Sequence, residues 1–123
     1  MRDPPLILVV DDVPDNVEIL QLRLESQGYD IVTAGDGEEA FARVRQGTYD
    51  AVICDLKMPR VDGMMLYRAI AAATPTLARR VIFVTGDVAG TDAERFLEES
   101  GCRWLAKPFR LADLLRAVKE GLG

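Results

Sequence analysis

Side chains that could do chemistry stand directly after apolar runs at four places in this sequence. Asp11 and Asp12 follow LILVV, Asp55 follows AVIC, Thr85 follows VIFV, and Lys107 follows RWLA. A carboxylate at the carboxyl end of a buried strand is costly unless a neighbouring group compensates its charge. We therefore take Asp55 as the first candidate for chemistry and ask whether the other runs bring partners to it.

Brought together, these residues would form a site for phosphoryl transfer. Three carboxylates at short range repel one another, and a divalent cation relieves that repulsion. Carboxylate oxygens are the hard ligands that Mg²⁺ prefers, and Mg²⁺ keeps open positions for phosphate oxygens. Lys107 would add a positive charge and Thr85 a hydrogen-bond donor for a phosphoryl group. Asp55 can act as the nucleophile, because carboxylates form acyl phosphates.

Composition excludes several other chemistries and partners. The sequence has no histidine, so it has no imidazole base and no histidine-ligated zinc. A net charge of −5 argues against direct nucleic-acid binding. The longest apolar runs are too short to span a membrane, and MRDPP is not a signal peptide, so we expect a cytoplasmic protein. Cys54 and Cys102 lack metal-ligand spacing and are interpreted as reduced thiols.

Periodicity predicts the elements that position these residues. Short apolar runs predict buried strands at 6–10, 31–34, 51–54, 81–84 and 103–106. Between and after them, helical spacing predicts five helices, and the last carries Leu111, Leu114, Leu115 and Val118. Asp36 and Glu39 have capping-box spacing, as do Thr91 and Glu94. Pro14 suits a first helical turn, and the helix stops are assigned to Gly28, Gly47, Pro75 and Gly101.

The alternation of strands and helices predicts an α/β fold. Five strands that alternate with five helices at short spacing indicate a parallel sheet covered on both faces. The carboxyl ends of all strands then share one edge, where open parallel sheets bind ligands. We expect residues 1–123 to form one domain, with no output domain in this sequence.

Four segments in order carry a family resemblance: LILVVDDVPDN, DAVICDLKMPRVDG, VIFVTGD and WLAKPF. The chain resembles the response regulator receiver domains of bacterial two-component signalling. The resemblance implies a flavodoxin-like fold with strand order 2-1-3-4-5. It also implies that Asp55 takes a phosphoryl group from a histidine kinase or a histidine phosphotransfer domain and becomes an aspartyl phosphate.

The same resemblance implies roles for the other candidates. Asp12 and Asp55, with the backbone carbonyl of Lys57, would hold Mg²⁺, and Asp11 would act mostly through water. Thr85 would contact the phosphoryl oxygens. Lys107 would pair with them and precede Pro108 through a cis peptide bond.

The resemblance further implies a switch and a partner surface. Thr85 moves toward the phosphoryl group, and the aromatic residue three positions before Lys107 turns inward. That residue here is Trp104, where the family usually has Tyr or Phe, so the larger ring puts the standard movement in doubt. A downstream effector would bind the surface made by the helix from Thr91, the strand 103–106 and the last helix. The expected state is a monomer or weak dimer.

Other interpretations remain open at this point. Asp11 and Asp12 could simply favour the start of a helix, and Trp104 could be a half-buried strand aromatic. An Asp-nucleophile phosphohydrolase of the haloacid dehalogenase type needs an acid at position 57, which is Lys here. A nucleotide-binding module lacks its glycine-rich cradle, and a degenerate receiver would lack one of the site residues. The chain could be a stand-alone regulator or the receiver part of a hybrid histidine kinase.

Overall fold

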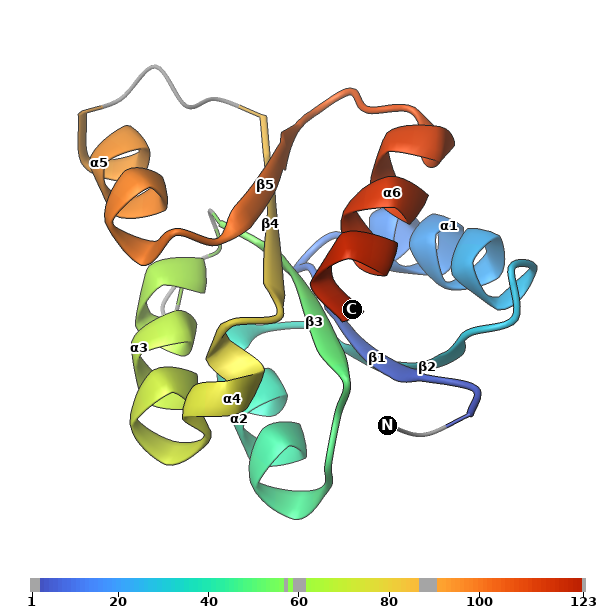
Figure 1. Ribbon diagram of the computed structural model, residues 1–123, viewed down its shortest axis with the longest axis horizontal. Helices are drawn as coiled ribbons and strands as arrows, with labels where there is room; N and C mark the ends of the chain where they lie inside the picture. Colours follow the sequence, from blue (N-terminus) through green and yellow to red (C-terminus); the bar gives the residue numbers. More distant parts are fainter. Residues whose placement is uncertain (1–2, 57, 59–61, 87–90, 123) are drawn as a thin grey trace.

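A five-stranded parallel sheet forms the centre of the molecule in the computed structural model, which describes residues 3–56, 58, 62–86 and 91–122 (Figure 1). The strands are β1 (Leu6–Val10), β2 (Asp30–Ala34), β3 (Ala51–Asp55), β4 (Val81–Thr85) and β5 (Arg103–Ala106). Their order is β2-β1-β3-β4-β5, and every neighbouring pair is parallel. The predicted α/β fold and strand order are therefore confirmed.

The helices are α1 (Pro14–Glu25), α2 (Gly37–Gln46), α3 (Gly63–Ala73), α4 (Pro75–Ala78), α5 (Thr91–Ser100) and α6 (Leu111–Leu122). The prediction of five helices was wrong, because the described residues form six and no periodic pattern marks the short α4. Pro75 does end α3, as predicted, but it also occupies the first position of α4, where its missing N–H is not needed.

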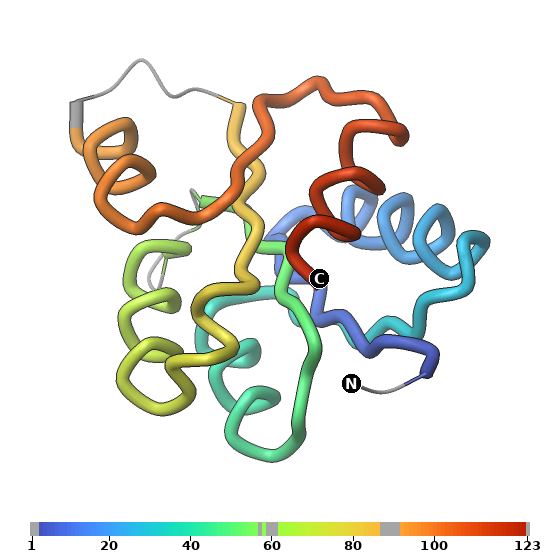
Figure 2. Tube along the Cα trace, viewed as in Figure 1, coloured from blue at the N-terminus to red at the C-terminus, as the bar shows by residue number. Residues whose placement is uncertain are grey.

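Helices cover both faces of the sheet. On one face, α1 and α6 pack over Ile7, Val9 and Ile53. On the other, α2, α3 and α5 pack over side chains such as Val52 and Phe83. Figure 2 shows the chain leaving β5 and arching over to α6, which lies beside α1. Because β1, β3 and β4 are buried from both sides, their sequences read as continuous apolar runs.

Local signals at the helix ends behave largely as predicted. The Asp36 carboxylate accepts a hydrogen bond from the Glu39 N–H at 2.7 Å, and it caps α2. The Glu39 carboxylate accepts from the Gly35 N–H at 3.3 Å. Gly28 and Gly101 both have positive φ, which only glycine adopts without strain. Among the described residues, no helix has both the length and the apolar character needed to cross a membrane.

Candidate phosphoryl-transfer site

Three carboxylates converge where β1 and β3 end. Asp11 follows β1, Asp12 is next to it, and Asp55 is the last residue of β3. One oxygen from each lies within 4.8 Å of the others. Asp11 and Asp55 are buried, at 1% and 7% exposure, whereas Asp12 is exposed to solvent. The predicted acidic cluster is therefore present. Asp11 and Asp55 lie inside the protein, and Asp12 lies at the surface beside them.

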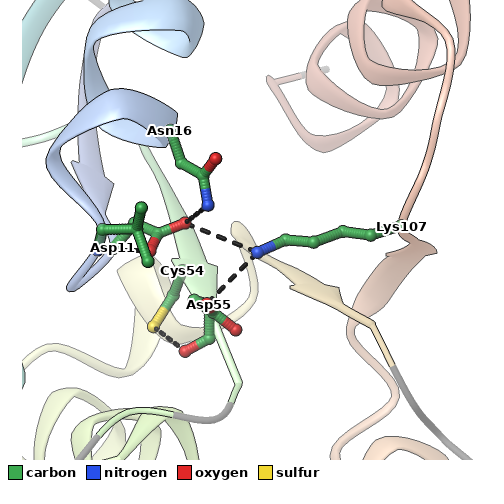
Figure 3. Close-up of polar contacts among 6 residues, drawn as sticks. Asp11, Asn16, Cys54, Asp55 and Lys107 are labelled. Carbon is green, nitrogen blue, oxygen red and sulfur yellow. Dashed lines mark hydrogen bonds and ion pairs between the residues drawn. The ribbon is translucent and has the colours of Figure 1, made fainter.

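Lys107 reaches this cluster from the end of β5 (Figure 3). Its Nζ lies 3.2 Å from Asp55 Oδ2 and 3.5 Å from Asp11 Oδ2. The Lys107 N–H donates to the Thr85 carbonyl at 2.8 Å, and the Lys107–Pro108 bond is cis, as the resemblance implied. Burial alone would lower the pKa of Lys107, but the charges of Asp55 and Asp11 outweigh it and leave that pKa raised. The ammonium therefore compensates two buried carboxylates.

Asp11 is held by the start of α1. The Val13 N–H donates to Asp11 Oδ1 at 2.9 Å, and Asn16 Nδ2 donates to Asp11 Oδ2 at 3.3 Å. Val13 is the N-cap of α1 and makes no side-chain cap of its own. The idea that Asp11 merely helps to begin a helix is thus partly right, but the same carboxylate also contacts Lys107.

The remaining predicted residues lie in three different settings. Thr85 is fully buried at the end of β4, on the same edge of the sheet. Lys57, whose carbonyl was expected to bind metal, lies outside the described residues. Trp104 lies on β5 with 41% of its surface exposed, beside a groove between β5 and α6. The structure thus brings Asp11, Asp12, Asp55 and Lys107 together, and it shows Trp104 facing outward.

Two neighbours of Asp55 were not singled out by sequence reasoning as contributors to the site. The Cys54 thiol donates to the Asp55 carbonyl at 3.2 Å, and burial, together with the adjacent Asp55 charge, strongly raises the pKa of that thiol. Gly63, at the start of α3, packs against the backbone that carries Asp55. A Cβ on Gly63 would meet the Asp55 carbonyl oxygen at 2.8 Å and Leu56 Cα at 2.9 Å. Glycine is therefore required for this close approach.

The donor set fits a hard divalent cation. Carboxylate oxygens with few competing nitrogen or sulfur ligands suit Mg²⁺ rather than zinc. The carboxylate oxygens already lie within 4.8 Å of one another. Ligands of an octahedral Mg²⁺ are about 3.0 Å apart when adjacent and about 4.2 Å apart when opposite, so the carboxylates would have to converge by up to about 2 Å or bind in part through water.

The protein is a doubly wound α/β domain whose acids and lysine gather at the carboxyl ends of its strands, the edge at which such sheets bind ligands. The chain belongs to the response regulator receiver domain family, whose model matches residues 7–119. This places it in two-component signalling as a signalling domain, in agreement with the resemblance noted from the sequence.

Curated and solved relatives agree with this placement. The transcriptional regulatory protein GlrR of Escherichia coli K12 is 34% identical over 119 residues, which cover 97% of this chain and 26% of GlrR. The chain thus spans about a quarter of that relative.

Among solved structures, the receiver domain of a Pseudomonas aeruginosa sensor histidine kinase has 33% identity and a TM-score of 0.85, with 97% of this chain and 98% of that one covered. It holds a magnesium ion in its active-site cleft. The Thermotoga maritima response regulator TrrA, solved with Mg²⁺ and BeF, has 33% identity and a TM-score of 0.83, with 96% and 99% covered.

Proposed function

We propose that residues 1–123 form a receiver domain that accepts a phosphoryl group on Asp55 in a Mg²⁺-dependent reaction. The observation that carries this proposal is the convergence of Asp11, Asp12 and Asp55 within 4.8 Å, with Lys107 Nζ at 3.2 Å from Asp55. The carboxylates of Asp11 and Asp12 and the ammonium of Lys107 thus lie around the Asp55 carboxylate. That arrangement serves a nucleophile whose product carries additional negative charge.

In the proposed reaction, an Asp55 oxygen attacks the phosphorus of a phosphohistidine on a histidine kinase or histidine phosphotransfer domain. The oxygen–phosphorus bond forms as the nitrogen–phosphorus bond breaks, and the imidazole leaves with the bonding electron pair. Lys107 then pairs with the phosphoryl oxygens, and Thr85 donates a hydrogen bond to them. Mg²⁺ held by Asp12, Asp55 and the Lys57 carbonyl, with Asp11 acting mostly through water, would offset the charge that builds up on the phosphoryl group.

Phosphorylation would alter the partner surface made by α5, β5 and α6. Lys107 contacts Asp55 through its side chain and Thr85 through its backbone. A change at Asp55 therefore reaches the ends of β4 and β5 directly. Trp104, three residues before Lys107, lies on this surface, and we propose that it is the moving aromatic residue. The effector would bind there, with the chain a monomer or weak dimer.

Intact-mass spectrometry with a small acyl-phosphate donor tests the proposal. We expect one phosphoryl group per chain with Mg²⁺, none with EDTA, and none in Asp55→Asn. Glu98→Gln, a change at an exposed acid on α5, is the control and should label normally. Steady release of phosphate without a labelled chain would instead indicate a hydrolase. Unchanged labelling of Asp55→Asn would place the acceptor elsewhere.

A further inference from the structure

Asn16 is the only asparagine in the chain, and its side chain enters the acidic pocket from the first turn of α1 (Figure 3). Its Nδ2 lies 3.3 Å from Asp11 Oδ2. A carboxylate oxygen can only accept, so the carboxamide nitrogen must be the donor. The Asn16 N–H also bonds to the Val13 carbonyl at 3.1 Å, which fixes the backbone from which the side chain projects.

Asn16 and Lys107 contact the same oxygen of Asp11. Lys107 Nζ lies 3.5 Å from Asp11 Oδ2 and closer, at 3.2 Å, to Asp55 Oδ2. The other Asp11 oxygen is occupied by the Val13 N–H. Oδ2 therefore accepts from Asn16 while it stays 3.5 Å from Lys107 Nζ, which is longer than the roughly 2.7–2.9 Å of a close charge-assisted bond, and a closer approach to Lys107 would draw it away from Asn16. A neutral amide restrains the carboxylate in this way without cancelling its negative charge.

We propose that Asn16 is a positioning residue that limits pairing between Asp11 and Lys107. While Asn16 holds Oδ2, the Asp11 carboxylate stays available to a cation, and Lys107 keeps its shorter contact with Asp55. Without it, Lys107 draws Asp11 from the present 3.5 Å into a closer ion pair that a cation must break. The identity of the cation as Mg²⁺ rests on the proposed function. The contacts among Asn16, Asp11 and Lys107 do not.

A double-mutant cycle read by Mg²⁺ titration calorimetry tests the coupling. Asn16→Leu keeps the approximate side-chain shape and removes the donor. We expect it to weaken Mg²⁺ binding about three- to ten-fold, the range for loss of one hydrogen bond. In the Lys107→Met background, the same change should weaken binding less than about two-fold. Equal weakening in both backgrounds, or none with Lys107 present, would overturn the proposal.

A metal-free measurement keeps the inference separate from the proposed function. Labelling of the asparagine carboxamide with ¹⁵N gives one pair of carboxamide proton signals, because the chain has one asparagine. We expect one of its protons to be shifted from the position of free asparagine, and to return toward it in Asp11→Ala. A signal like that of free asparagine in the wild type would overturn the inference. If the signal is shifted and the titration shows coupling, the inference stands even where Asp55 fails to accept phosphate.

Discussion

Lys107 and Asp55 are 52 residues apart in sequence, yet Lys107 Nζ lies 3.2 Å from Asp55 Oδ2. The parallel sheet produces this contact, because Asp55 ends β3 and Lys107 follows β5, with β4 between them. The ammonium also reaches Asp11, so one positive charge compensates two buried acids. Lys107 therefore stabilises the two acids and would compete with any cation that binds them.

Lys107→Met should separate these two effects. Without the ammonium, Asp11 and Asp55 repel each other, and we expect the metal-free free energy of unfolding to fall by about 1–2 kcal/mol. Mg²⁺ should then stabilise the variant more than it stabilises the wild type. Urea denaturation with and without Mg²⁺ measures both quantities. Lys119→Met, at an exposed position on α6, should change stability by less than about 0.5 kcal/mol. Equal Mg²⁺ stabilisation of wild type and Lys107→Met would show that Lys107 does not compete with the cation.

Mg²⁺ should raise the melting temperature of the wild-type protein. A ligand at ten times its Kd stabilises the folded state by about 1.4 kcal/mol, which corresponds to roughly 5 °C for a domain of this size. Asp12→Asn should lose most of the shift, since it removes one carboxylate from the pocket. Asp30→Asn makes the same chemical change at the opposite edge of the sheet, where β2 begins, and should retain the shift. A melting curve unaffected by millimolar Mg²⁺ would argue against the metal site.

Gly63→Ala should be destabilising although alanine is the better helix former. The new Cβ would lie 2.8 Å from the Asp55 carbonyl oxygen, so the strand end that carries Asp55 must move. We expect a loss of about 1–3 kcal/mol, typical of overpacking. Gly86→Ala is the matched control, because a Cβ there meets nothing within 4 Å. Chemical denaturation of both variants makes the comparison; equal stabilities would mean that the approach of α3 to Asp55 is not constrained.

Trp104 is the only tryptophan, so its fluorescence reports on one position. With 41% of its surface exposed, it should be readily quenched by acrylamide in the unphosphorylated protein. If it moves inward as proposed, quenching should decrease when an acyl-phosphate donor and Mg²⁺ are added. The Asp55→Asn variant should show no decrease. Quenching that stays constant while intact mass shows full phosphorylation would exclude Trp104 as the moving residue.

Much of the fold was predictable because this type of sheet leaves strong local signals. The strands β1, β3 and β4 are buried on both faces, so their apolar runs are unbroken. Each run is followed by, or ends at, a polar residue (Asp11, Asp55 or Thr85), so the sequence alone indicated which edge of the sheet carries the site. The helix α4 was missed because only four residues form it, and Pro75 both ends α3 and begins α4.

The parts of the site that could not be predicted depend on close three-dimensional contacts. Gly63 reads as an ordinary turn glycine, and only the structure shows that it packs against the Asp55 backbone. Asn16 reads as a residue in a helical first turn, and its bond to Asp11 follows from how α1 leaves β1. The outward position of Trp104 depends on β5 being an edge strand with one open side.

Chemical mapping of the phosphorylated residue tests the central claim most directly. After reaction with an acyl-phosphate donor and Mg²⁺, borohydride reduces an aspartyl phosphate to homoserine, and peptide mass spectrometry locates the change. We predict homoserine at position 55 alone, dependent on Mg²⁺ and absent when the donor is omitted. Homoserine at another aspartate, or none in a chain that carries phosphate, would contradict Asp55 as the acceptor.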